Sequence, residues 1–176
     1  MRLAQPDGAH LTYCTNIHPG ESWPAVRDAL TTHVPRVRDS LAPAGPFGVG
    51  LRAAKRAADD LDDPAAFAEL RGILAAQNFY VFTVNGFPFG AFHGQRVKQS
   101  VYDPDWRNGE RRSYSAQLAR RLAALLPEGM TGSVSTVPGA FRPNAATEAD
   151  VDAVVATLLA HAGDLWRLRE ATGRTV

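Results

Sequence analysis

Four short segments rich in apolar and β-branched residues alternate along this chain with four longer segments whose apolar residues recur every three or four positions. The first pattern predicts buried strands, and the second predicts helices with one buried face. Strands that alternate with crossover helices form parallel sheets with right-handed connections. The alternation therefore predicts an α/β protein of four strand–helix units, which restricts the fold more than any other feature of the sequence.

The predicted strands cover residues 11–15, 47–51, 79–84 and 132–137. The run at 79–84 is continuous and apolar, as in a parallel strand covered on both faces. The predicted helices begin near Ser22, Asp63, Gly109 and Thr147, with a capping box at the last of these. Pro35 predicts a kink or two shorter helices, because proline lacks an N–H and clashes with the preceding turn. The last helix has a predicted inner stripe of Val151, Val154, Val155, Leu158, Ala162 and Leu165.

After the fourth helix, a turn at Gly173-Arg174 leads to Thr175-Val176, which resembles the start of a fifth strand. A repeat of this kind closes into a barrel only when eight strands complete the ring. We therefore expect residues 1–176 to form a single, incomplete domain. Its predicted fold class is α/β, the N-terminal half, (β/α)4, of a TIM barrel.

The charge balance favours a small-molecule ligand. Lys and Arg number 19 against 18 Asp and Glu, without a run of five like charges, so neither nucleic acid nor an anionic membrane surface is an expected partner. The single cysteine, Cys14, cannot form an internal disulfide. No signal-peptide pattern and no apolar stretch of membrane-spanning length is seen, so we expect a cytoplasmic location without a membrane span.

The candidate site residues are those that follow the strands, because barrel sites are built at the C-terminal ends of strands. Polar groups, rings and glycines gather there, and they suit a pocket for a small hydroxylated compound. The candidate catalytic residues are His18 and His93, and the candidate substrate-binding residues are Asn16, Arg52, Asn85, Phe87, Lys98 and Ser135.

Each candidate also has a simpler interpretation. Asn16 and the pair Asn85-Gly86 are common in tight turns, and His18 could serve only to hydrogen-bond its loop. Phe87 could belong to a small loop core, and His93 and Lys98 could be solvated. The basic residues Arg111, Arg112, Arg120 and Arg121 are expected on a solvated helix face. No metal-ligand spacing, phosphate-binding glycine loop or nucleophile elbow is present, so the residues alone assign no reaction.

Three segments carry a family resemblance: 11–23 (LTYCTNIHPGESW), 80–88 (YVFTVNGFP) and 101–106 (VYDPDW). Together they closely resemble the metabolite traffic protein EboE family, over nearly the whole chain. The resemblance implies a TIM barrel of the xylose-isomerase-like type. It also implies partner proteins from the same bacterial operon, linked to moving a secondary-metabolite precursor toward the periplasm. Members run to roughly twice this length, as a full barrel of about 250 residues with insertions requires.

Two functions are predicted. The first is binding or processing of a small secondary-metabolite precursor for export, as the EboE resemblance implies; binding alone needs no catalytic base. The alternative is a divalent-metal-dependent sugar or sugar-phosphate isomerase or epimerase, with His18 or His93 as the acid/base group and Lys98 or Arg52 as an anion contact. In the wider superfamily the later strands supply most metal ligands. Any divalent metal is therefore expected to bind outside these residues, and we expect the chain alone to be inactive.

Overall fold

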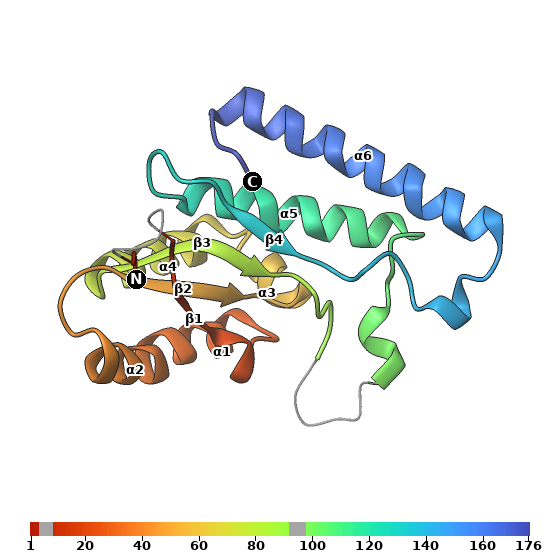
Figure 1. Ribbon diagram of the computed structural model, residues 1–176. Coiled ribbons are helices and arrows are strands. Elements are labelled where there is room, and N and C mark those ends of the chain that lie inside the picture. The colour runs from red at the N-terminus through yellow and green to blue at the C-terminus, as the bar shows by residue number, and fades with distance from the viewer. Residues whose placement is uncertain (4–8, 92–97) are drawn as a thin grey trace.

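The sheet of this α/β protein is parallel and has a simple strand order. In the computed structural model, which describes residues 1–3, 9–91 and 98–176, the strands lie in the sequential order β1-β2-β3-β4 (Figure 1). All neighbouring strands run parallel. The strands are β1 (Thr12–Cys14), β2 (Phe47–Arg52), β3 (Phe79–Asn85) and β4 (Ser133–Ser135). The predicted order and direction of the four strands are confirmed.

Helices connect successive strands, as the alternating pattern predicts. They are α1 (Trp23–Asp28), α2 (Val34–Leu41), α3 (Lys55–Asp60), α4 (Pro64–Ala76), α5 (Gly109–Leu125) and α6 (Glu148–Thr172). Asp63 caps α4, and Thr147 with Asp150 forms the predicted capping box of α6. The sequence does not predict α3, because six residues are too few to display a helical period. Among the described helices, none is long and apolar enough to cross a membrane.

The interruption predicted at Pro35 is present. Helix α1 continues through a π-helical segment, Ala29–His33, into α2, and Pro35 lies in the first turn of α2. Proline has no N–H to donate, and its ring clashes with the turn before it. A wider π-helical turn directly before Pro35 accommodates both constraints. The same turn ends at His33, which lies beside the loop that follows β1.

One face of the sheet carries the hydrophobic core. Val49 of β2 and Val81 and Val84 of β3 are at most 2% exposed. They belong to one cluster with buried helix residues that include Val26 of α1 and Leu118 of α5. Burial of apolar surface is the main force that favours folding, so this helix-covered face supplies most of the stability.

The opposite face of the sheet, which we call the open face, has a different composition. In Figure 1 helices α3, α4 and α5 lie behind the strands, away from this face. Strand alternation and side-chain contacts assign to it Thr12, Cys14, Gly48, Gly50, Tyr80, Phe82, Thr83, Asn85, Ser133 and Ser135. A register shift, in which Gly50 pairs with Thr83 instead of Phe82, forms a β-bulge that places both Phe82 and Thr83 on the open face.

Gly48 allows the N-terminal segment to approach β2 closely. A Cβ atom at this position would lie 2.7 Å from the Leu11 carbonyl oxygen and 2.8 Å from the Met1 nitrogen. The N-terminal segment is itself held by an antiparallel bridge between Arg2 and His10. These backbone atoms of Met1 and Leu11 leave no room for a side chain, so position 48 requires glycine for steric reasons.

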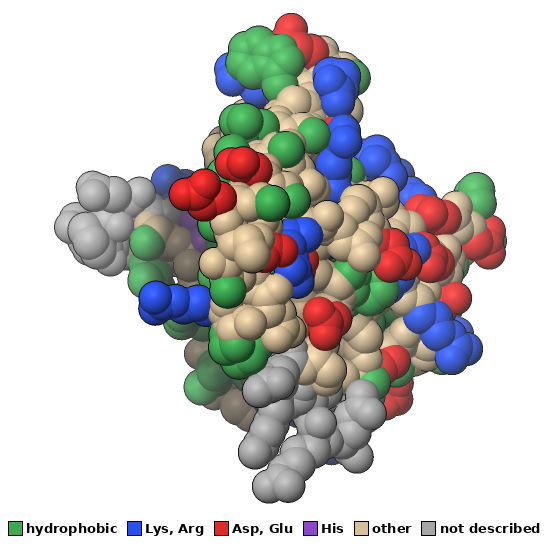
Figure 2. Space-filling view, turned by 90° about the vertical axis from the view of Figure 1, so that its right-hand side faces the viewer, with side chains coloured by type: hydrophobic (Ala, Val, Ile, Leu, Met, Phe, Trp, Pro, Cys, Tyr) green, Lys and Arg blue, Asp and Glu red, His purple; other side chains and the backbone are tan. Residues whose placement is uncertain are grey.

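The predicted inner stripe of α6 is wrong. Val151, Val155 and Leu158 are 55%, 48% and 39% exposed, and Ala162 is also exposed. The helix contacts α5 through another side, which includes Asp164. Figure 2 shows apolar side chains at the surface along α6, in the upper part of the view. An apolar period shows which residues can be buried, but a partner must lie on that side to bury them.

We expect Gly48→Ala to destabilise the protein by roughly 1–3 kcal/mol, the usual range for overpacking. Gly72→Ala is the matched control, because Gly72 lies inside α4 with open space around its Cβ position. Alanine there should stabilise the helix by about 0.5–1 kcal/mol. Urea unfolding of the two variants measures both effects, and equal stabilities would contradict the steric argument.

Candidate functional site

Parallel strands bring their C-terminal ends to one edge of the sheet, and several candidate residues lie there. Asn16 lies in a short 3-10 helix, Thr15–Ile17, directly after β1, and His18 follows it. Arg52 ends β2, Asn85 ends β3 and Ser135 ends β4. The site therefore has the location that the strand-end rule predicts, and the side-chain contacts decide which of these residues form one group.

Asn85 and Ser135 form the centre of the site. The Ser135 hydroxyl lies 3.1 Å from the Asn85 Oδ1 atom, and the Phe87 N–H donates to the same oxygen at 3.3 Å. Asn85 is half-buried and Ser135 is exposed, so both are open to a ligand. Because the amide oxygen is engaged, the amide NH2 group is the donor that Asn85 presents, and no described residue accepts from it. An amide donor beside a hydroxyl suits the hydroxyl groups of a small ligand.

The turn that follows Asn85 is held by hydrogen bonds to its carbonyl oxygens, a set that we call the turn clamp. The carbonyls of Gly86 and Phe87 accept from the Arg111 guanidinium at 2.9 and 3.3 Å. The Lys55 N–H donates to the Phe89 carbonyl at 2.8 Å. The Tyr114 hydroxyl donates its one hydrogen to the Ala53 carbonyl at 2.6 Å and lies 3.4 Å from the Pro88 carbonyl.

The fourth carbonyl of the clamp, at Gly90, accepts from Arg52 at 3.3 Å. The buried Arg52 guanidinium also lies 3.0 Å from Glu21 Oε1 and 3.4 Å from the His18 carbonyl oxygen. Its backbone N–H donates to the Thr15 hydroxyl at 2.9 Å. With a fully buried side chain, Arg52 joins the loops after β1 and β3 and does not extend into open space as an anion contact would.

His18 belongs to a second group. Its Nε2 atom lies 2.9 Å from the Tyr13 hydroxyl, and its ring stacks on His33 with ring centroids 4.3 Å apart. Tyr13 packs against the hydrophobic core and His33 lies in the helical layer, so the His18 ring points to the helix-covered side of the sheet. Asn85 and Ser135 lie on the open face. The structure therefore does not bring His18 together with them.

Three aromatic rings lie in the segments that follow Asn85 and Ser135 along the chain. Phe87 contacts Tyr102 edge to face, with ring centroids 6.2 Å apart, and Tyr102 lies 5.4 Å from Phe141. These rings come from the segments after β3 and β4, so the two strand-end loops meet. All three rings are half-buried, which leaves part of each surface available to a ligand. We call Phe87, Tyr102 and Phe141 the aromatic wall.

Two candidates are placed only partly or not at all. His93 lies outside the described residues. Lys98 begins a 3-10 helix, Lys98–Tyr102, that carries Tyr102 to the aromatic wall.

The sequence predicts that Arg111 and Arg120 lie on a solvated helix face. This prediction is wrong for Arg111, whereas Arg120 is exposed as predicted. Arg111 is fully buried, donates to the Pro104 carbonyl at 2.7 Å, and lies over the rings of Phe89 and Tyr114. Burial lowers the pKa of its guanidinium. The signal that could have found it is spacing, because positions 111, 114, 118 and 122 form the buried stripe of α5.

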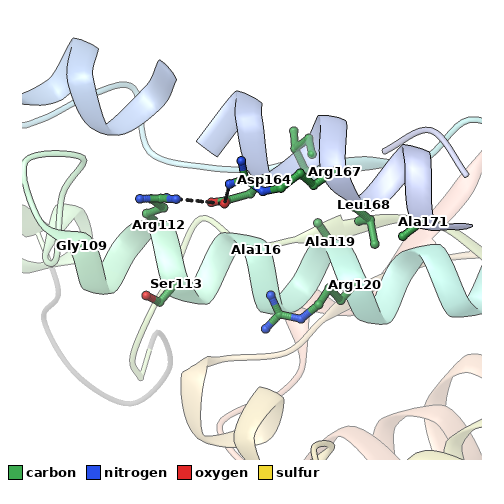
Figure 3. A pocket seen from close by; sticks show the side chains of 11 residues that line it. Gly109, Arg112, Ser113, Ala116, Ala119, Arg120, Asp164, Arg167, Leu168 and Ala171 are labelled. Carbon is green, nitrogen blue, oxygen red and sulfur yellow. Dashed lines mark hydrogen bonds and ion pairs between the residues drawn. The ribbon is translucent and has the colours of Figure 1, made fainter. Parts of the chain in front are cut away.

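A groove between α5 and α6 is a separate feature on the outside of the helical layer (Figure 3). Asp164 of α6 accepts from Arg112 of α5 at 2.7 and 2.9 Å and from Arg167 at 2.6 Å. The hydrogen bond from Arg112 lowers the pKa of Asp164 to about 2. The carboxylate of Asp164 and the guanidinium groups of Arg112 and Arg167 neutralise one another, and the Arg112–Asp164 pair joins the two helices. The charged residues of this groove therefore serve to pack α6 against α5.

Comparison of the chain with family models, with curated proteins and with solved structures gives no match. Within residues 1–3, 9–91 and 98–176, no group of three or more His, Cys, Asp or Glu side chains is arranged to hold a metal ion. The contacts described above therefore carry the functional argument.

We expect Arg111→Ala to destabilise the protein by roughly 2–5 kcal/mol, because it leaves the buried Gly86 carbonyl and the partly buried Phe87 and Pro104 carbonyls without their donor. Arg120→Ala, on the exposed side of the same helix, is the matched control and should change the free energy of unfolding by less than about 0.5 kcal/mol. Chemical unfolding measures both. A stable Arg111→Ala protein would show that the turn clamp does not depend on this side chain.

Acid should weaken the contact between α5 and α6. The pKa of Asp164 is about 2 in the folded protein, against a usual value of 3.8, so the folded state binds fewer protons between these values. The contribution of ionised Asp164 to the free energy of unfolding is fully present above about pH 4 and is lost as the pH falls toward 2. Asp164→Asn should make stability less dependent on pH in that window, whereas Asp152→Asn, an exposed change on the same helix, should not. Unfolding curves measured across the window test this expectation.

Proposed function

We propose that this chain binds a small hydroxylated metabolite at the C-terminal edge of its sheet, between the Asn85–Ser135 pair and the aromatic wall. The observation that carries the proposal is the combination of amide and hydroxyl groups with nearby aromatic rings at a turn in which the carbonyls of Gly86, Phe87, Phe89 and Gly90 accept hydrogen bonds. Polar groups orient a hydroxylated ligand, and ring faces supply affinity. A turn held in place loses little entropy when the ligand binds.

The fold that suits this site best is a TIM barrel of the xylose-isomerase-like type, of which the chain supplies four strand–helix units. Four sequential parallel strands and a polar strand-end site are compatible with such a half. The resemblance to the EboE family extends the proposal to biological role. In that role the metabolite is a secondary-metabolite precursor, bound or processed before export with proteins of the same operon. No contact among the described residues favours the isomerase or epimerase alternative.

Asn85→Asp is the sharpest test of ligand recognition. The substitution keeps an oxygen that can accept from Ser135 and Phe87, and it removes the amide N–H donors that would meet a ligand hydroxyl. The probes are xylose, glucose, myo-inositol and glycerol at millimolar concentration, with binding measured by the rise in Tm and by NMR shift changes. We expect at least one polyol to bind the wild type, and Asn85→Asp to weaken that binding about tenfold or more.

Asn144→Ala is the control, because Asn144 is an exposed asparagine outside the Asn85–Ser135 group. Its binding should equal that of the wild type. Asn85→Asp should also keep its free energy of unfolding within roughly 1 kcal/mol of the wild type, so that lost binding does not reflect lost folding. If no polyol binds the wild type, or if both variants bind alike, the contacts of Asn85 and Ser135 serve only to stabilise the turn, and the proposal is wrong.

A further inference from the structure

The aromatic wall is built from two separate loops. Phe87 and Tyr102 come from the chain after β3, and Phe141 comes from the chain after β4. Rings on two loops form a common surface only while the loops stay together. Tyr102 and Phe141 are both half-buried, so their contact alone removes little apolar surface from water. Another contact must therefore hold the two loops in place.

Trp106 is buried between these loops. The residue is only 1% exposed. Its indole Nε1–H donates to the Thr136 hydroxyl at 3.1 Å, and its backbone N–H donates to the Gly139 carbonyl at 2.9 Å. Thr136 directly follows β4, and Gly139 lies two residues before Phe141. One residue of the loop after β3 thus engages the loop after β4 at two points.

The indole ring also contacts α6. His161 of this helix packs against the ring of Trp106, with ring centroids 5.2 Å apart. Gly139 approaches the same helix, because a Cβ atom there would lie 3.4 Å from Val154. The φ of Gly139 is +71°, a left-handed conformation that favours glycine. Trp106 therefore lies where the loop after β3, the loop after β4 and α6 meet.

The turn clamp extends to the same segment. Arg111 donates to the Gly86 carbonyl at 2.9 Å and to the Pro104 carbonyl at 2.7 Å. Gly86 directly follows Asn85, and Pro104 lies two residues before Trp106. The position of Trp106 is therefore fixed relative to the polar side of the proposed site as well as to the aromatic wall.

Arg107, the neighbour of Trp106, adds contacts at the surface. It donates to the Asn144 carbonyl at 2.6 Å and pairs with Asp105 and Asp150 at 2.8 and 2.7 Å. The Arg107 side chain is 29% exposed, so water and salt weaken these ion pairs. The contacts of Trp106 are shielded from solvent, and they hold the loops more firmly for that reason.

We propose that Trp106 is a positioning residue of the ligand site, which holds the two loops together and so assembles the aromatic wall before a ligand arrives. The inference rests on the proposed function, because it assigns a role in ligand binding. Apparent affinity falls in proportion to the fraction of molecules that have the competent structure. A wall that is already assembled also spares the ligand the entropy cost of ordering two loops.

Trp23 provides a matched control. It is also a buried tryptophan, at 6% exposure, and its Nε1–H donates to Glu69 at 2.9 Å. Glu69 belongs to α4, so this hydrogen bond joins α1 to α4 and not the strand-end loops. Trp106→Leu and Trp23→Leu each remove a buried indole and one side-chain hydrogen bond, and both should lower the Tm.

Binding and ring contacts then separate the two variants. The probe is whichever of xylose, glucose, myo-inositol and glycerol binds the wild type most tightly. Trp106→Leu should weaken its binding about tenfold or more, whereas Trp23→Leu should bind as the wild type does. NMR cross-relaxation between the rings of Tyr102 and Phe141, measured without ligand, should be lost in Trp106→Leu and kept in Trp23→Leu.

The outcomes distinguish this inference from the proposed function. Unchanged binding in Trp106→Leu, equal losses in both variants, or a ring contact that survives Trp106→Leu would overturn the positioning role and leave the proposed function standing. A wild type that binds no polyol would overturn the proposed function. The ligand-free ring contact would then decide whether Trp106 holds the loops together.

If Trp106→Leu does not fold, the exposed residue Thr136 carries the test. Thr136→Val removes the acceptor of the indole N–H and should weaken binding about fivefold, the equivalent of one hydrogen bond. Thr136→Ser keeps the hydroxyl and should bind as the wild type does. Equal binding by these two variants would contradict the positioning role.

Discussion

Carbonyl oxygens withdrawn from water without hydrogen-bond donors are costly, and in the turn after β3 the carbonyls of Gly86, Phe87, Phe89 and Gly90 each accept a hydrogen bond. For the buried Gly86 carbonyl, loss of its donor would cost about 1–3 kcal/mol. The donors come from outside the turn: Arg52 from the end of β2, the Lys55 backbone from α3, and Arg111 from α5. The turn therefore fixes the positions of two strands and two helices, and the orientation of Asn85 at the strand end follows from it.

Burying Arg111 carries its own cost, because a guanidinium loses water when it enters a protein interior. The lowered pKa of Arg111 reflects that desolvation. Three carbonyl dipoles and the faces of two aromatic rings offset it. A lysine or methionine could not replace this arrangement, since only the planar guanidinium fork reaches several acceptors at once.

The sequence predicts the features that depend on local chemistry. The apolar run of β3, the cap at Asp63 and the interruption at Pro35 all appear where residue patterns place them. The strand-end rule likewise predicts that Asn85 and Ser135 come together. Features that depend on a tertiary partner are not predicted. Arg111 shares the period of the buried α5 stripe, but its charge suggests solvent, because the carbonyls it meets are distant in sequence.

His18 shows the same limit for the site. Its place after β1 follows from the sequence, but the direction of its ring depends on Tyr13 and on His33. His33 faces the loop because the π-helical turn before Pro35 changes the phase of the helix there. A shift of this kind rotates the His33 side chain around the helix axis by a fraction of a turn. That small rotation decides whether the His18 ring stacks on His33 in the helical layer or faces a ligand.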